Sequence, residues 1–117
     1  MKNLNTYIVE KNKTFELNID ERQALSNFIG IVCGNLGDQK DQEELKSVID
    51  PLEDKEILQL RELHDCLDDK QTYKSINLKT IIDDIPLIKK LYKLADDNDL
   101  LDEQWDLIDA FEKICLN

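Results

Sequence analysis

The chain has 117 residues, of which 41% are hydrophobic and 35% charged, and its formal net charge is −11. This length predicts a single domain, residues 1–117, that can bury a core without metal or disulfide staples. The negative charge argues against direct nucleic-acid binding and against a membrane-surface role, because its field repels polyanions.

Several features indicate a cytoplasmic protein. No apolar run approaches the ~20 residues needed to cross a bilayer, and residues 1–10 lack the zones of a signal peptide. The three cysteines, Cys33, Cys66 and Cys115, are an odd number and far apart, and each has apolar neighbours. We expect them to be reduced, buried thiols. A preference for Lys, Asn, Asp and Ile favours AT-rich codons, as in a low-GC bacterium or its phage.

The first 18 residues predict a short β-hairpin. Residues 6–10 and 13–17 are rich in β-branched and aromatic side chains, and Lys11–Asn12 between them can form the turn. Asn18 and Glu21 then have the spacing of a capping box, which predicts that a helix begins there. Gly34 and Gly37 mark its end. Its inner face has helical spacing and consists of Leu25, Phe28, Ile29, Val32 and Leu36.

The middle of the chain predicts two more helices. Residues 38–49 read as a short helix with Leu45, Val48 and Ile49 on its apolar side. Asp50 then caps a longer helix, with Pro51 at its first position and Glu53 completing a capping box. That helix runs to about Leu67, and Asp68–Asp69 lies at or past its end. Its inner stripe is Ile57, Leu60, Leu63 and Leu67.

The last third of the chain predicts a further pair of helical segments after a connector at residues 70–77. Leu78, Ile81, Ile82 and Ile85 form a short stripe, and Pro86 either kinks the helix or restarts it. The helix continues to Ala95 and is followed by a polar break at residues 96–99. A final helix carries Leu101, Trp105, Ile108, Phe111 and Cys115, and this helical spacing is more typical of a core position for Trp105 than of an exposed one. The expected fold is therefore mainly α: a compact bundle of about five helices over residues 19–117, with the hairpin at residues 1–18.

No motif in the sequence predicts catalysis or a cofactor. His64 is the only histidine, so no multi-histidine metal site or histidine-based triad can form within one chain. We expect it to flank the apolar stripe of its helix and to hydrogen-bond a neighbour. The run from Asp96 to Asp102 fails as an EF-hand, because Leu occupies the fifth position in either register. The three glycines match no phosphate-binding loop. We therefore predict a protein that is not an enzyme and binds neither metal nor cofactor.

The charge distribution is the most informative feature. Residues 38–69 hold twelve Asp/Glu against four Lys/Arg, and residues 96–112 hold eight Asp/Glu and no basic residue. Residues 70–95 hold six Lys against two Asp. In the expected final helix, Asp102, Asp106 and Asp109 fall on one face, where like charges cost a few tenths of a kcal/mol per pair.

These three carboxylates on one helix face have two alternative explanations. Lys89, Lys90 and Lys93 on the preceding helix could neutralise them across an antiparallel pairing. Alternatively, the carboxylates face a basic protein partner and resemble the phosphates of a nucleic acid. The partner-facing residues would then be Asp99, Asp102, Glu103, Asp106, Asp109 and Glu112.

The second explanation predicts a small acidic inhibitor that binds a basic, nucleic-acid-processing protein stoichiometrically, as phage anti-defence proteins, antitoxins and immunity proteins do. The alternative is a non-catalytic structural or accessory subunit that forms homo-oligomers through exposed aromatic residues such as Tyr73, Tyr92 or Trp105.

Overall fold

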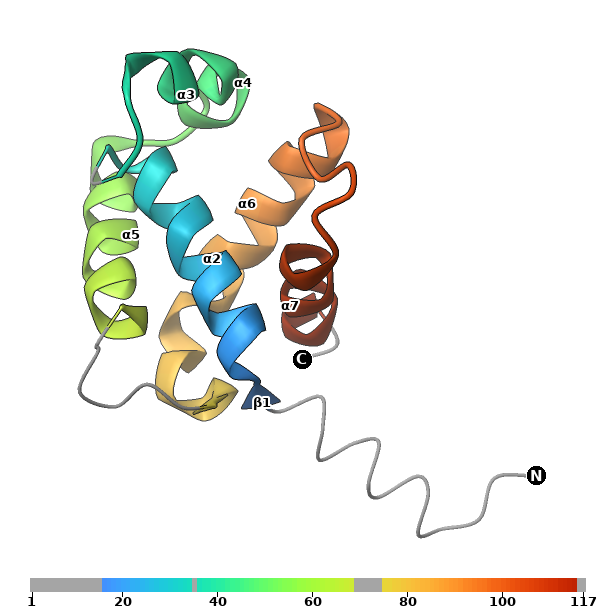
Figure 1. Ribbon diagram of the computed structural model, residues 1–117. Helices are drawn as coiled ribbons and strands as arrows, with labels where there is room; N and C mark the ends of the chain where they lie inside the picture. The colour runs from blue at the N-terminus through green and yellow to red at the C-terminus, as the bar shows by residue number, and fades with distance from the viewer. Residues whose placement is uncertain (1–15, 35, 69–74, 116–117) are drawn as a thin grey trace, which may run out of the picture.

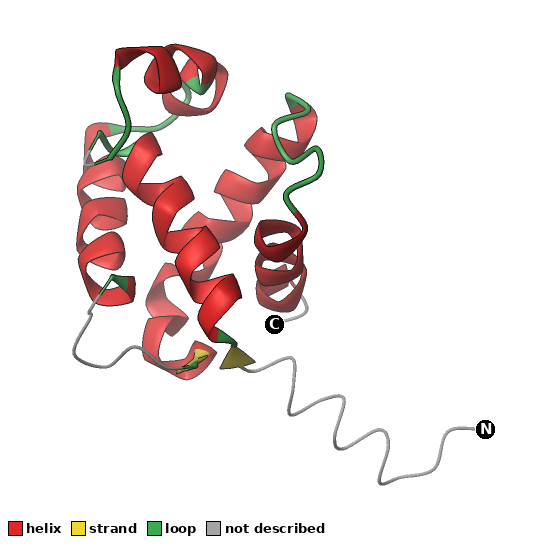
Figure 2. Ribbon diagram, viewed as in Figure 1, coloured by secondary structure: helices red, strands yellow, loops and turns green. Residues whose placement is uncertain are grey.

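The computed structural model describes residues 16–34, 36–68 and 75–115 of the chain (Figure 1). It confirms the mainly α fold class, a bundle accompanied by a two-stranded antiparallel sheet (Figure 2). The described elements are, in chain order, β1 (Glu16–Leu17), α2 (Ile19–Val32), α3 (Gln39–Glu44), α4 (Lys46–Ile49), α5 (Asp54–Leu67), β2 (Ile76–Asn77), the 3₁₀ helix η2 (Leu78–Asp84), α6 (Ile85–Asp97) and α7 (Trp105–Cys115). Among these helices, none combines the length and the apolar character that a bilayer crossing requires.

Helix α2 begins at the predicted capping box and ends just before the predicted glycines, at Val32. Leu36, which was predicted on its inner face, lies beyond the helix and is exposed. The Asn18 side chain accepts a hydrogen bond from the backbone N–H of Glu21, and the Glu21 carboxylate accepts one from the backbone N–H of Asn18, which completes the capping box. After the helix, Gly34 and Gly37 both adopt left-handed backbone angles, with φ of 81° and 80°. Only glycine takes this conformation without strain, so these two residues turn the chain out of the helix.

The single helix predicted at residues 38–49 is divided in two. Asp38 caps α3 through a capping box with Asp41. Leu45 then leaves the helical conformation, with φ of −93° and ψ of 7°, and separates α3 from α4. Leu45 and Val48 are both buried. The break lets both side chains reach the core, whereas none of the residues of α3 itself is buried.

Helix α5 begins three residues later than predicted. Asp50 continues the helical backbone at the end of α4, and Pro51 lies in the turn that follows. The N-cap is Glu53, whose capping box is completed by Glu56. The predicted C-terminus is confirmed, because α5 ends at Leu67.

The described sheet joins the segment before α2 to the segment that follows α5. Glu16 pairs with Asn77 and Leu17 with Ile76, in antiparallel register. Residues 6–10, the partner strand of the predicted hairpin, lie outside the described residues. The pairing that the structure describes for Glu16–Leu17 is thus a long-range contact, which seats Leu17 in the core with no exposed surface.

Pro86 restarts the helix, which resolves the alternative left open by the sequence. The segment before it, η2, is a 3₁₀ helix, in which every third side chain falls on the same side. Leu78 and Ile81 are accordingly buried, whereas Ile82 is 59% exposed and the predicted four-residue stripe is wrong there. Pro86 then occupies the first turn of α6, where its missing N–H leaves no partner unsatisfied.

Helix α2 lies at the centre of the bundle, with α5 along one side and α7 along the other (Figure 1). The Phe111 ring of α7 is central to the packing between helices. Its centroid lies 5.9 Å from that of Phe28 on α2, in an edge-to-face arrangement, and 5.1 Å from that of Tyr92 on α6. The three helices α2, α6 and α7 therefore share one aromatic cluster.

Two arginine side chains join α2 to α5. The Arg22 guanidinium, which is 3% exposed, donates from Nε to the carbonyl of Leu67 at 2.8 Å and from Nη2 to that of Cys66 at 3.2 Å. These carbonyls end α5, where the helix dipole favours a cation. In the opposite direction, Arg61 of α5 donates to the carbonyl of Cys33, which caps α2, at 3.1 Å. The two arginines of the chain thus hold α2 and α5 antiparallel.

A buried ion pair connects α2 to α7. Lys113 Nζ lies 2.6 Å from Glu21 Oε1, and the Glu21 side chain is 3% exposed. The same carboxylate oxygen accepts the capping hydrogen bond from Asn18. One carboxylate therefore completes the start of α2 and fixes the last turn of α7 against it.

Candidate functional site

We call the eight carboxylates of residues 96–112 the acidic end. They lie on the last turn of α6, in the turn after it and on the outer side of α7. All eight are exposed. The acidic end consists of Asp96, Asp97, Asp99, Asp102, Glu103, Asp106, Asp109 and Glu112. In Figure 1 the turn between α6 and α7 lies at the upper end of the molecule, as do α3 and α4.

The prediction that Asp102, Asp106 and Asp109 share one helix face is wrong for Asp102. Helix α7 begins at Trp105, so Asp102 lies in the turn and only Asp106 and Asp109 belong to the helix. Asp99 and Glu103 adopt left-handed backbone angles, with φ of 56° and 59°, and are the only described non-glycine residues to do so. Asp99, Asp102 and Glu103 therefore all precede the first turn of α7.

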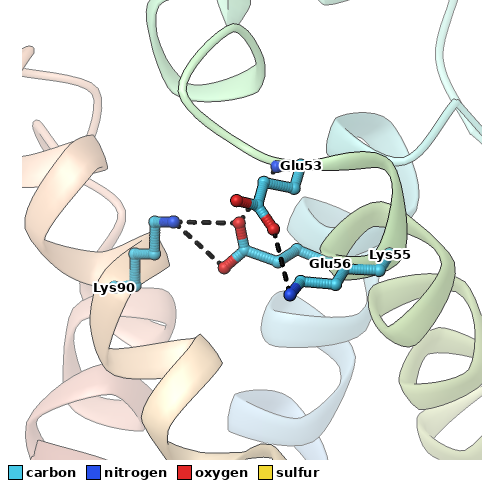
Figure 3. Close-up of polar contacts among 4 residues, drawn as sticks. All are labelled: Glu53, Lys55, Glu56 and Lys90. Atoms are coloured by element: carbon cyan, nitrogen blue, oxygen red, sulfur yellow. Dashed lines mark hydrogen bonds and ion pairs between the residues drawn. The ribbon is translucent and has the colours of Figure 1, made fainter.

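The acidic end is not neutralised by close ion pairs with the lysines of α6. Lys90 was one of three candidates, but its Nζ lies 2.9 Å from Oε1 and 3.0 Å from Oε2 of Glu56, on α5 (Figure 3). Lys89 and Lys93 form no ion pair with any residue that the structure describes. Over the described ranges, no carboxylate of the acidic end lies within 4.0 Å of a basic nitrogen.

The field of the acidic end reaches two neighbouring groups. Burial raises the pKa of the Tyr92 phenol, and the negative charges of Asp96, Cys115 and Glu112 raise it further. Cys115 is exposed, but partial desolvation of its thiol still raises the pKa, with Lys89 lowering it and Glu112 raising it again. Glu112 thus disfavours a second negative charge on both α6 and α7, as expected where carboxylates are not locally compensated.

One hollow of the surface is bordered by carboxylates. It has a volume of about 520 Å³ and is lined by Asp96, Asp99, Leu101, Asp102 and Ile108. Within the parts of the chain that the structure describes, no three His, Cys, Asp or Glu side chains are grouped so that they could hold a metal ion. A broad anionic hollow of this kind suits an extended cation, such as a lysine or arginine side chain, which can reach several carboxylates in turn.

A second hollow of about 400 Å³ lies between α2 and the start of α7, and Trp105 borders it. The indole is 70% exposed, so the sequence expectation that Trp105 belongs to the inner stripe of the last helix is wrong. The stripe that is buried is Leu107, Ala110, Phe111 and Ile114. This set has the i, i+3, i+4, i+7 spacing of a helix face, and that signal could have excluded Trp105 and Cys115 from the core.

The chemistry-bearing residues outside the acidic end also differ from expectation. Cys33 is buried, but Cys66 and Cys115 are exposed, because apolar neighbours along the chain do not place a helical residue on the inner face. His64 is 5% exposed, and neither ring nitrogen has a hydrogen-bond partner. Its Nδ1 lies 3.5 Å from Asp65 Oδ1, without the geometry of a hydrogen bond. The ring instead packs against Gly30, where an added Cβ would lie 2.9 Å from it.

No protein-family model matches the chain, and comparisons with curated proteins and with solved structures find no match.

Proposed function

We propose that this protein is a small, non-catalytic inhibitor that binds a basic surface of one protein partner stoichiometrically through its acidic end. The observation that carries the proposal is the set of eight exposed carboxylates with no basic residue among residues 96–112. Like charges this close lower the stability of a helix and a turn unless something outside them compensates. A basic partner surface supplies that compensation when the complex forms.

The partner's chemistry follows from the arrangement of the charges. Carboxylates distributed along a turn and a helix form an extended anionic surface, as the phosphates of a nucleic acid do. A protein that processes nucleic acid presents the complementary basic surface, and opposed fields speed its encounter with the acidic end. This places the protein with phage anti-defence proteins, antitoxins or immunity proteins, acting in the cytoplasm of a bacterium or of its infected host.

The alternative is a structural or accessory subunit that associates with itself. The 70% exposed Trp105 favours it, since aromatic residues are enriched in interfaces. Glu103 and Asp106 border the same hollow as Trp105, however, so two copies meeting there would bring like charges together. Such contacts cost several kcal/mol across an interface. A basic partner is therefore the better match.

The proposal is tested by affinity capture with three baits, each read by mass spectrometry at low and at high salt. The first is the natural protein. The second carries Asp102→Asn, Asp106→Asn and Asp109→Asn in the acidic end, and the third carries Glu43→Gln, Glu44→Gln and Glu62→Gln at exposed positions of α3 and α5. The second and third baits have the same net charge.

The expected result is one stoichiometric partner that is lost at high salt and is depleted only with the acidic-end variant. Equal depletion with both triple variants would mean that net charge, and not the acidic end, attracts the partner. Recovery of only the protein itself would support the structural-subunit alternative.

A further inference from the structure

The hollow beside Trp105 has an apolar floor between two helices. Ala24, Phe28 and Ile31 of α2 form one side of it, and Leu107 of α7 contributes to the other. The Phe28 ring is itself fixed by its edge-to-face contact with Phe111 in the core. The floor is therefore a rigid extension of the bundle core to the surface.

Trp105 is the most exposed large hydrophobic side chain in the described residues, at 70%. An exposed indole presents a large apolar face to water, and tryptophan is the aromatic residue that attracts cations most strongly. The other exposed members of this class, such as Leu58 and Ile82, do not border the hollow. Trp105 is thus the one large apolar side chain among them that stands between an apolar floor and solvent.

The carboxylates at the rim of the hollow favour an occupant with positive charge. Glu103 and Asp106, one on each side of Trp105 in the sequence, both line the hollow and are both exposed. No basic residue lines it. An occupant with a cationic group gains from the carboxylates, and a second copy of this acidic chain would be repelled.

We propose that this hollow binds an arginine-bearing segment of the partner, an inference that rests on the proposed function and assigns its anchoring point. The arginine guanidinium stacks on the Trp105 indole and pairs with the carboxylates of Glu103 and Asp106. Arginine matches this set better than lysine, because its planar, weakly hydrated group both stacks on aromatic rings and forms bidentate pairs with carboxylates. An apolar side chain next to the arginine enters against Phe28 and Ile31. The acidic end then attracts the partner, and the hollow determines which segment is held.

The test uses the full chain and two fluorescently labelled peptides of equal length and charge. One alternates arginine with leucine, and the other alternates lysine with glycine. Dissociation constants come from anisotropy, and the emission of Trp105 reports occupancy directly because it is the only tryptophan. The variants are Trp105→Ala, Trp105→Leu, which keeps an apolar side chain without a π face, and Ile82→Ala as the control at an exposed apolar position outside the hollow. Circular dichroism verifies that each variant is folded.

The natural protein is expected to bind the arginine–leucine peptide about tenfold more tightly than the lysine–glycine peptide, with a saturable change in tryptophan emission. Trp105→Ala and Trp105→Leu should both reduce this preference to the share that the leucines gain against Phe28 and Ile31, whereas Ile82→Ala should keep it whole. An undiminished preference in Trp105→Ala, or binding that leaves the emission of the natural protein unchanged, would overturn the inference.

The outcome also separates this inference from the proposed function. If the lysine–glycine peptide binds the natural protein but not the triple Asn variant of the acidic end, the proposed function holds even where the Trp105 variants have no effect. If that variant binds this peptide as the natural protein does, the proposed function fails regardless of the hollow. A concentration-dependent dimer in light scattering that Trp105→Ala abolishes would assign the hollow to a second copy and overturn the inference.

Discussion

Charged side chains at the centre of the bundle form ion pairs and hydrogen bonds, whereas those at the acidic end face solvent. Around α2, Arg22 donates to the carbonyls that end α5, and Lys113 lies 2.6 Å from the buried Glu21 carboxylate. At the acidic end, eight carboxylates are exposed, and none has an ion-pair partner among the residues that the structure describes. The charges around α2 therefore join helices to one another, and those of the acidic end do not.

This difference gives a way to distinguish charges that stabilise the fold from charges that do not. A buried charge must be paired, because its desolvation costs several kcal/mol, so removing its partner destabilises the fold. An exposed, uncompensated carboxylate outside the first turn of a helix can be removed without loss of stability, and often with a small gain. The sign and size of the stability change on substitution should therefore separate the two regions.

The largest effect is expected at the ion pair between Glu21 and Lys113. Lys113→Met leaves a carboxylate buried without its cation, which should lower the free energy of unfolding by about 3 kcal/mol. Urea denaturation measures this. Combining it with Glu21→Gln should recover part of the loss, since the amide oxygen can still accept the capping hydrogen bond from Asn18. Lys93→Met, at an exposed position, should change stability by less than about 0.5 kcal/mol.

The two arginines should differ from each other. Arg22→Met removes two hydrogen bonds from a charged, buried donor and should cost about 2 kcal/mol. Arg61→Met removes one hydrogen bond to Cys33 from an exposed residue and should cost about 1 kcal/mol or less. The same denaturation experiment compares them. Equal costs would mean that burial at the α2–α5 crossing is not what makes Arg22 important.

Within the acidic end, two substitutions should act with opposite signs. Glu112 lies in the last turn of α7, where the helix dipole disfavours an anion, so Glu112→Gln should stabilise the protein by about 0.5 kcal/mol. Asp106 lies in the first turn, where the dipole favours an anion, so Asp106→Asn should destabilise it by a similar amount. Thermal unfolding at low ionic strength gives both values.

Glu112→Gln has a second expected effect. The pKa of the Cys115 thiol should fall, because the Glu112 charge raises it. The rate of alkylation against pH measures this in a Cys66→Ser background, which removes the other exposed thiol. An unchanged profile would contradict the idea that the field of Glu112 is uncompensated.

The smallest effect concerns pH and the contact in Figure 3. The backbone N–H of Glu53 and then the Lys90 ammonium hold the pKa of Glu56 below its ordinary value of 4.5. A carboxyl whose pKa is lower in the folded state stabilises the fold above the unfolded value and loses that contribution as the pH falls through the folded value. Glu56→Gln should therefore lose less stability than the natural protein as the pH drops below 4.5. Parallel curves in acid would show that the contact contributes nothing.

Local signals in the sequence predicted part of the local structure. The capping box at Asn18 and the glycine turn after α2 depend on residues a few positions apart, and both are present. The signal at Asp50 failed, because the N-cap of α5 is Glu53, and at Pro86 the sequence left a kink and a restart open. The division at Leu45 and the pairing of Glu16–Leu17 with Ile76–Asn77 depend on contacts far along the chain. No local pattern encodes those contacts, so they could not be predicted.

The candidate site divides in the same way. The turn at Asp99 was predicted as part of the polar break at residues 96–99, but its extension through Asp102 and Glu103 was not. The extension includes a left-handed backbone at Glu103. Non-glycine residues seldom adopt that conformation, so a sequence containing neither glycine nor proline there gave no sign of it. Trp105 was assigned to the wrong face because the helix was expected to begin near Leu101.

The most direct test of the central claim is the salt dependence of partner binding by the two triple variants of equal net charge. The account predicts that neutralising Asp102, Asp106 and Asp109 weakens the complex and flattens its dependence on salt, while neutralising Glu43, Glu44 and Glu62 changes neither. If the acidic-end variant binds with unchanged affinity and unchanged salt dependence, and has only a raised melting temperature, the acidic end is no more than a solvated surface and the account is wrong.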